Sequence, residues 1–329
     1  MRKYFILLPM LFLAIGNIWA QDSEFEVWRK QKSEEYNKWK RIRIEMAGIL
    51  PNIYQDSVSD FINQGFIVAS QISVDKLIKS NMKVWMVIVG IADYKYPTYF
   101  NPLQYADDDA TDVYDFYKKP EGGSLPDSQI KILIDKDATR DNILNAINSI
   151  YAKANDNDAI IFYFSGHGDK DAFYTHEYNG NIRNRNGLLL HKELREVFEK
   201  SKAKYKYIIA DACHVGNLAD TGINQPSGSS KGTFYEAFER SSKGFVMLLS
   251  CKSDENSREY EGYIRHGIFT YFLLEGLKGK CDVNKDLVIS VIELYEYVSN
   301  GVKKVTNNNQ NPVIFGNYDD TLPIAIVQE

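Results

Sequence analysis

Short apolar runs alternate with amphipathic stretches along the second part of the chain. The runs are rich in β-branched residues and predict buried strands at 83–90, 130–134, 159–164, 205–210 and 245–249. Between them, apolar residues at helical spacing predict helices at 107–117, 139–154 and 192–200. Alternating strands and helices are typical of a largely parallel β-sheet with helices on both faces, so we expect an α/β fold. In such sheets, catalytic groups gather outside the carboxyl ends of the strands.

The first 20 residues have the pattern of an export signal. Arg2 and Lys3 form a basic start, an unbroken apolar run follows at 4–15, and Ala20 supplies a small residue before the predicted cleavage point. The run is too short to cross a hydrocarbon core of about 30 Å as a helix. We therefore expect a signal peptide at 1–20, no stable membrane insertion, and a periplasmic or secreted protein. A retained membrane anchor is the alternative.

Residues 21–82 predict a helical N-terminal segment. Positions 21–45 are dense in charge, and apolar residues recur among them at roughly helical spacing. The pattern indicates a polar helix with one apolar stripe, which is either a pro-region over the active site or a helix packed on the domain. Pro51 ends this helix. The remaining residues, 83–329, are predicted to form one catalytic domain.

Composition excludes several classes of protein. The chain has 39 Lys and Arg against 44 Asp and Glu, so it lacks the basic excess of a nucleic-acid binder. Its three cysteines, Cys213, Cys251 and Cys281, are too few to hold a small disulfide scaffold together. Their odd number leaves at least one thiol unpaired within a monomer, and Cys251 and Cys281 are either paired or free.

Reactive residues follow two of the predicted strands. Ser165-Gly-His-Gly168 comes directly after one strand, and Asp211-Ala-Cys-His214 comes directly after another. Both strands end at the same edge of the sheet, so we expect Cys213 and His167 to form a nucleophile and its proton shuttle. The backbone amides of Gly168 and Cys213 would hold the oxyanion.

The other histidines have no predicted role in this site. His214 is adjacent to Cys213 in sequence and is badly placed to serve as its base. His176, His191 and His266 lie in unremarkable contexts. The Cys213-His214 doublet lacks a second ligand pair at suitable spacing, so it does not predict a zinc site.

Matching flanks accompany the two tetrads, at 89–93, 103–110, 249–255 and 266–271. Together these segments resemble the caspase-like cysteine peptidases, and within them the bacterial metacaspase-like branch. The likeness runs from about Val84 to Gly316. It implies a caspase-like sandwich, Cys213 as nucleophile, His167 as its partner, peptide bonds as substrate and no required cofactor.

The resemblance also implies a pocket for the residue before the scissile bond. Metacaspase-like members line this pocket with acids and accept Arg or Lys, and the matching positions here are Asp109, Ser165 and Asp211. Ala106 stands where metacaspases often carry Cys. Two carboxylates that converge on one pocket are costly unless a cation neutralises them, so we expect protein or peptide substrates with Arg or Lys before the cut. For Asp109 the alternative is an exposed helix acid.

Four polar residues have a spacing near that of a calcium loop: Asp282, Asn284, Asp286 and Glu293. The expected Gly at the sixth position is Leu287, which would strain the turn. The sequence therefore leaves two interpretations, a weak calcium site or a turn whose acids cap the helix containing 293–297. Some metacaspases depend on calcium, but the resemblance identifies no site here.

A flexible loop at 226–232 lies within a predicted linker at 217–243. Related enzymes mature by cutting in or near such a linker, so Lys231 is a candidate for self-cleavage. Two alternatives to an active metacaspase-like enzyme remain. One is a catalytically silent scaffold, although silent relatives usually lose the Cys or the His. The other is a clostripain-like or legumain-like peptidase on the same fold.

Overall fold

A mixed β-sheet forms the centre of the protein. The computed structural model describes residues 82–169, 171–181, 186–212, 244–252, 254–260 and 264–327. Within them, the main sheet has the spatial order β12-β8-β7-β3-β1-β2. Its strands are β1 (Val84–Gly90), β2 (Ile130–Ile134), β3 (Ala159–Ser165), β7 (Tyr205–Asp211), β8 (Phe245–Leu249) and β12 (Val313–Asn317). The first five run parallel, and β12 pairs antiparallel with β8 at one edge.

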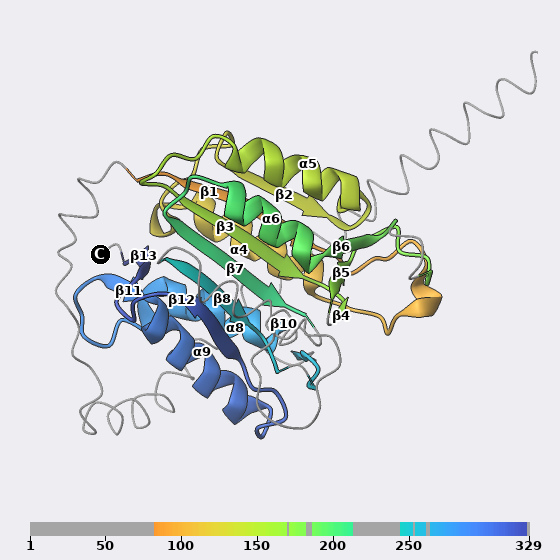
Figure 1. Cartoon of the computed structure of the whole chain (residues 1–329). Helices are drawn as coiled ribbons and strands as arrows, with labels where there is room; N and C mark the ends of the chain where they lie inside the picture. Colours follow the sequence, from red (N-terminus) through yellow and green to blue (C-terminus); the bar gives the residue numbers. More distant parts are fainter. Residues whose placement is uncertain are drawn as a thin grey trace, which may run out of the picture. The chain divides into compact units, whose positions relative to one another are not determined.

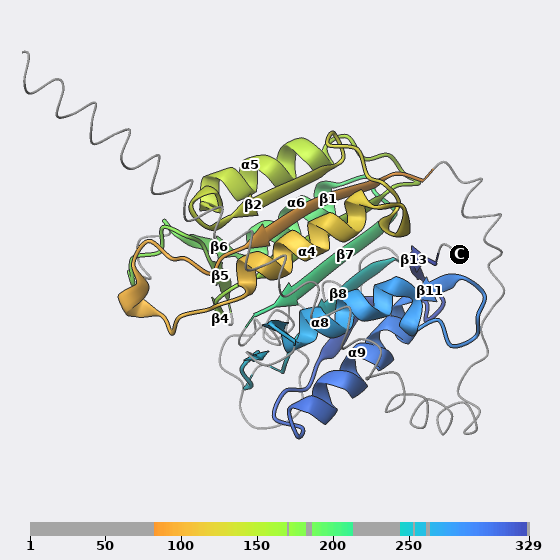
Figure 2. The ribbon, with the colours of Figure 1, turned by 180° about the vertical axis from the view of Figure 1, so that it is seen from behind.

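Helices cover both faces of this sheet (Figures 1 and 2). One face carries α5 (Arg140–Tyr151) and α6 (His191–Lys200), and the other carries α4 (Ala106–Lys118) and α8 (Ile268–Glu275). The helix α9 (Val291–Val305) packs on α8. The apolar residues of β1 that face α5 and α6 share one core cluster with both helices. The predicted α/β architecture with helices on both faces is confirmed.

Short elements surround the main sheet. A three-stranded antiparallel sheet consists of β4 (Gly168–Asp169), β5 (Ala172–Tyr174) and β6 (Leu188–Leu190). Two further antiparallel pairs join β9 (Glu259–Tyr260) to β10 (His266–Gly267), and β11 (Val288–Ser290) to β13 (Pro323–Ile326). Short 3-10 helices lie at η1 (Pro97–Tyr99), η2 (Pro120–Gly122) and η3 (Asp135–Asp137), and the π-helical η5 (Gly276–Lys280) continues α8.

The register of the central strands aligns the ends from which the site is built. Gly90 of β1 lies opposite Ser165 of β3, and Ser165 lies opposite Asp211 of β7. Gly90 also lets α4 approach the sheet, because a Cβ there would lie only 2.4 Å from the Cβ of Ala110. This close approach brings the first turn of α4 to the carboxyl edge of the strands.

Several predicted features lie outside the described residues. These are the signal peptide at 1–20, the helical segment up to residue 81, the linker at 217–243, and Cys213, His214 and Lys231. In the part of the chain that is described, no helix has the length and apolar character needed to span a membrane.

Candidate active site

The imidazole of His167 lies in an aromatic environment just beyond β3. Its ring stacks on Phe100, with centroids 4.7 Å apart and an interplanar angle of 11°. The backbone N–H of His167 donates to the hydroxyl of Tyr94 at 2.8 Å. Its Nε2 lies 2.8 Å from the backbone oxygen of Asn101. A carbonyl oxygen only accepts hydrogen bonds, so Nε2 carries the proton and Nδ1 is the basic nitrogen of the neutral ring.

Burial favours the neutral form of this ring. It lowers the pKa of His167 below the ordinary value, and the Asn101 carbonyl opposes this in part. The neutral imidazole is the form that can accept a proton from a thiol. The environment of His167 therefore suits a general base at neutral pH.

Gly168 presents its amide away from the neighbouring strand. The backbone N–H of Tyr174 donates to the oxygen of His167 at 3.0 Å, and Gly168 is the next residue along, opposite Phe173. In an antiparallel ladder, hydrogen-bonded and non-hydrogen-bonded pairs alternate. The N–H of Gly168 consequently points out from the edge of its small sheet, as a donor to a substrate oxyanion requires.

The structure brings Asp109, Ser165 and Asp211 together in the interior. Their exposed fractions are 1%, 3% and 5%. The hydroxyl of Ser165 donates to Oδ2 of Asp109 at 3.0 Å. Both carboxylates border Gly267, where a Cβ would lie 2.2 Å from Oδ2 of Asp211 and 2.8 Å from Oδ2 of Asp109. Asp109 is thus a buried member of this cluster and not an exposed helix acid.

His266 is the residue that sequence reasoning missed. Its Nδ1 lies 2.7 Å from Oδ1 of Asp109, and its Nε2 lies 3.2 Å from Oδ2 of Asp112. Burial alone would lower the pKa of His266, but hydrogen bonds to the two carboxylates and their charges raise it to about 9. The side chain of His266 is therefore an imidazolium between two carboxylates. No role was predicted for it from the sequence. The only signal was its place in the 266–271 segment.

The two candidate pocket acids, Asp109 and Asp211, have different hydrogen-bond partners. Burial and, to a smaller extent, the charge of Asp211 raise the pKa of Asp109 to about 7, although the hydrogen bond and charge of His266 lower it. Burial also raises the pKa of Asp211. Asp211 accepts hydrogen bonds from the N–H and hydroxyl of Thr270, at 3.1 and 2.8 Å, and from the hydroxyl of Ser257. The Thr270 amide belongs to the first turn of α8, where a carboxylate is favourable.

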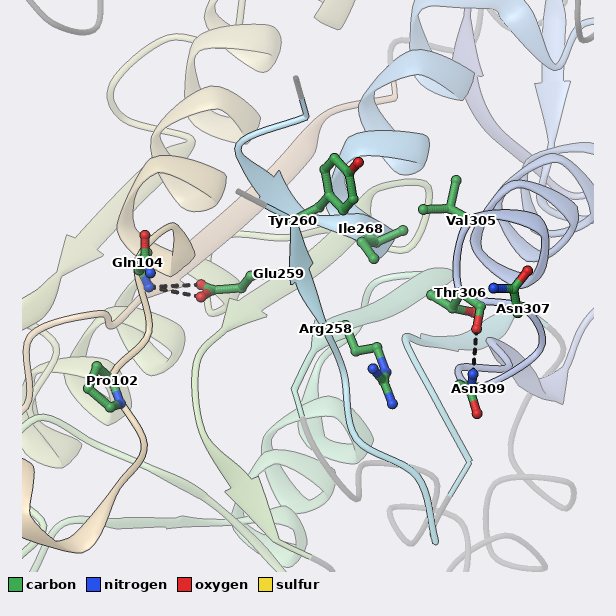
Figure 3. A pocket seen from close by; sticks show the side chains of 10 residues that line it. All are labelled: Pro102, Gln104, Arg258, Glu259, Tyr260, Ile268, Val305, Thr306, Asn307 and Asn309. Carbon is green, nitrogen blue, oxygen red and sulfur yellow. Dashed lines mark hydrogen bonds between the residues drawn. The ribbon is translucent and has the colours of Figure 1, made fainter. Parts of the chain in front are cut away.

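A cavity of about 510 Å³ lies between the segment before α4, the β9 segment and the end of α9 (Figure 3). On one side, the Glu259 carboxylate points to Gln104 and accepts hydrogen bonds from its backbone N–H at 2.9 and 3.1 Å. The cavity is lined by Pro102, Gln104, Arg258, Glu259, Tyr260, Ile268, Val305, Thr306, Asn307 and Asn309. Its wall includes chain neighbours of Asn101, Ser257 and Gly267, so it adjoins the segments that hold His167 and Asp211.

The predicted calcium residues lie in the turn before α9. Oδ2 of Asp282 accepts from the N–H of Leu287 at 3.1 Å, and Oδ1 of Asn284 accepts from the N–H of Asp286 at 2.8 Å. Glu293 accepts from the N–H of Ser290 at 2.9 Å in a reciprocal capping box at the start of α9. The structure thus contains a turn stabilised by Asp282 and Asn284 and a helix cap formed by Glu293. Leu287 adopts the left-handed conformation, with φ of 65°, that Gly was expected to supply.

The two cysteines that the structure describes, Cys251 and Cys281, are buried and form no disulfide with each other. The Cys251 thiol donates to the oxygen of Ala212 at 3.4 Å, and the Cys281 thiol donates to the oxygen of Gly276 at 3.2 Å. Burial raises the pKa of the Cys281 thiol, which makes it a poor nucleophile. Cys251 and Cys281 are therefore not paired with each other.

The chain is similar to solved structures and to one protein family. A search of the solved structures found 290 similar chains. One is the crystal structure of protein GSU0716 from Geobacter sulfurreducens, with 16% identity and a TM-score of 0.49 over 75% of this chain and 100% of that chain. A search of curated proteins found no match. The model of the caspase domain family matches residues 83–322. Because this match covers most of the sequence, the chain belongs to the caspase-domain family of cysteine peptidases.

Proposed function

We propose that the protein is an exported cysteine endopeptidase that cuts peptide bonds after Arg or Lys through Cys213 and His167. The observation that carries the proposal is the neutral, oriented imidazole of His167 at the carboxyl edge of the sheet. His167 and Cys213 each stand two residues beyond a matched pair in the sheet, Ser165 and Asp211. This register favours a meeting of the two side chains at one edge.

In the proposed mechanism, Nδ1 of His167 takes the proton of the Cys213 thiol. The thiolate attacks the carbonyl carbon of the scissile bond, and the amides of Gly168 and Cys213 stabilise the oxyanion. One such donor typically contributes about 2.7–4 kcal/mol to the transition state. The tetrahedral intermediate collapses as His167 gives its proton to the leaving amine, which leaves a thioacyl-enzyme. Water, activated by His167, then hydrolyses this thioester, releases the acid product and restores the thiol. The mechanism needs no cofactor.

The preference for Arg or Lys is supported by the buried acids. Among the described residues, the carboxylates of Asp109, Asp112 and Asp211 lie near the imidazolium of His266. Burial is the main cause of the raised pKa values of Asp109 and Asp211, because an ionised carboxylate is costly in the interior without a nearby cation. A guanidinium or ammonium group of the substrate would supply the missing positive charge, whereas an aspartate side chain would add to the repulsion. The cavity beside Glu259 offers an approach for the substrate chain.

The maturation and export of the enzyme belong to the same proposal. The signal-like pattern at 1–20 supports export. Lys231, in the predicted linker, matches the proposed specificity and would be a site of self-cleavage.

The test compares the wild type with Cys213→Ala and Cys281→Ala on reporter peptides that carry Arg, Lys or Asp before the reporter group. The wild type and Cys281→Ala should cleave the Arg and Lys peptides and spare the Asp peptide, whereas Cys213→Ala should lose at least about 10³-fold in kcat/KM. Mapping new N-termini should find a cut after Lys231 in the wild type and none in Cys213→Ala. Equal activity of Cys213→Ala and wild type would remove Cys213 as nucleophile. A preference for the Asp peptide would refute the basic pocket.

A further inference from the structure

We propose that residues 282–293, between η5 and α9, bind a calcium ion. In helix–loop–helix calcium sites, the ligands stand at positions 1, 3, 5, 7 and 12 of a twelve-residue loop, and position 7 contributes its backbone oxygen. Asp282, Asn284, Asp286, Val288 and Glu293 occupy these positions in this chain. The preceding α8 and η5 and the following α9 provide the two flanking helices. Two further features of this loop point to a cation: buried carboxylate oxygens without hydrogen-bond partners, and the direction of the Val288 carbonyl.

Two carboxylate oxygens of this loop are buried without a hydrogen-bond partner. Glu293 is only 7% exposed, and while its Oε2 binds Ser290, its Oε1 has no partner. Oδ1 of Asp282 is in the same situation. A buried carboxylate oxygen without a partner is costly, because it has lost its hydrogen bonds to water and no protein donor replaces them. These oxygens belong to positions 1 and 12 of the loop, and one divalent cation would satisfy both.

Two of the proposed ligands already contact each other, because the side-chain amide of Asn284 donates to Oδ2 of Asp286 at 3.2 Å. In the part of the chain that the structure describes, no three His, Cys, Asp or Glu side chains are already gathered as a metal site.

The backbone presents the carbonyl of position 7 on the correct side. The N–H of Val327 donates to the oxygen of Leu287 at 2.9 Å, and Val288 is the next residue along, opposite Ile326. Because bonded and non-bonded pairs alternate in an antiparallel ladder, the carbonyl of Val288 points away from β13. The N–H of Val288, on the same side, donates to Oδ1 of Asp286 at 2.9 Å, which shows that this side faces the loop.

The experiment measures binding and not proteolysis, so its result does not depend on the proposed function. It uses the full chain with Cys213→Ala to prevent self-cleavage, and titrates it with CaCl₂ or MgCl₂ in a calorimeter and in thermal unfolding. We expect a dissociation constant on the order of 10⁻⁴–10⁻³ M for calcium. Tm should rise by roughly 2–4 °C at saturating calcium. Magnesium should have a much smaller effect.

Two variants decide whether this loop is the site. Glu293→Gln keeps the capping box, since Gln also serves at that position, but removes the charged ligand. It should fold with nearly the wild-type Tm and lose at least about 10-fold in calcium affinity. Glu296→Gln, one turn further along α9, is the matched control and should bind as the wild type does. Equal binding by Glu293→Gln and the wild type would overturn the proposal, and so would the absence of any calcium-dependent heat or Tm shift.

Discussion

The proton position on His167 depends on groups that do not touch a substrate. The Asn101 carbonyl selects the Nε2–H tautomer, while Tyr94 holds the backbone at the same residue through the His167 N–H. The Tyr94 ring also contacts both Phe100 and the imidazole, with centroids 4.5 and 5.2 Å away. Tyr94 is therefore a positioning residue for the candidate base.

Replacing Tyr94 by Phe tests this role. The change keeps the ring contacts and leaves the His167 N–H without its acceptor, so we expect kcat to fall roughly 10-fold with little change in KM or Tm. Tyr174→Phe is the matched control, because the Tyr174 hydroxyl binds Asp169 at 3.1 Å and lies in the same aromatic group. Steady-state kinetics of both variants should separate them. Equal losses would assign the effect to packing instead of to the hydrogen bond.

At the level of single residues, the sequence predicted the acids but not their partners. The resemblance to metacaspase-like peptidases implied Asp109, Ser165 and Asp211 as pocket residues. Ser165 and Asp211 directly follow predicted strands, which brings these two to one edge of the sheet. His266, Thr270 and Ser257 belong to a later segment that folds back onto that edge. No local pattern reveals such a return, because it depends on how the whole segment packs.

Among the elements, α4 has an unusual N-terminus. Its N-cap residue, Tyr105, makes no side-chain cap, and Glu259 supplies the acceptor from far along the sequence. One oxygen of Glu259 accepts from the N–H of Tyr105 at 2.9 Å, and both oxygens accept from that of Gln104. A carboxylate at this position satisfies unpaired helix amides and favours the helix dipole. Since Asp109 lies in the first turn of α4, this cap also helps to fix the position of Asp109 in the candidate pocket.

Removal of this cap should weaken the protein measurably. We expect Glu259→Ala to lower the free energy of unfolding by about 0.5–2 kcal/mol, the range for a lost N-cap. Glu196→Ala, at an exposed position in the interior of α6, is the control and should change stability by no more than about 0.5 kcal/mol. Urea unfolding of the two variants provides the comparison. If Glu259→Ala were as stable as the control, the cap would contribute nothing.

The elements that the sequence failed to predict share a physical cause. The predicted strands and helices follow from clear hydrophobic patterns, and they correspond to β1, α4, β2, α5, β3, α6, β7 and β8. In contrast, α8 is apolar around most of its circumference and nearly all of it is buried, so it lacks the one-sided pattern of a surface helix. The pairs β9–β10 and β4–β5 contain too few residues for alternation to be recognised, and they exist because the surrounding chain holds them.

At the scale of the whole molecule, burial of an ion cluster links stability to pH. In the folded chain the pKa of His266 is about 9, compared with an ordinary value of 6.5. The imidazolium therefore stabilises the fold fully below pH 6.5, and this contribution is lost as pH rises through 9. Asp109, with its pKa raised to about 7 from 3.8, acts in the same direction, since the folded state again holds the proton more tightly. Asp112 and Asp211 also carry charge in this cluster, and Glu259 interacts with Asp211.

We therefore expect the unfolding midpoint in urea to fall between pH 7 and pH 9. His266→Gln should lower the free energy of unfolding by about 3–5 kcal/mol at pH 7, because it leaves buried carboxylates unpaired. It should also change the pH range of the decline, because the imidazole no longer titrates and Asp109 loses the group that lowers its pKa. His176→Gln is the control, since its Nδ1 bonds to the backbone oxygen of Asp93 at 2.7 Å and not to an acid. This control should keep the wild-type pH dependence. If the urea midpoint of His266→Gln fell with pH as that of the wild type does, the pH dependence would have to come from other groups.

The short segment from His266 to Thr270 has a consequence for how this sequence can diverge. His266 neutralises Asp109, Gly267 fits between two carboxylates, and Thr270 holds Asp211. A change at any one of these positions alters the value of the others, so their mutational effects should be epistatic. A lineage that lost Asp109 would keep the buried imidazole of His266 with only one of its two carboxylate partners, Asp112. Evolutionary drift here should therefore proceed by paired replacements, with the acids and this segment changing together.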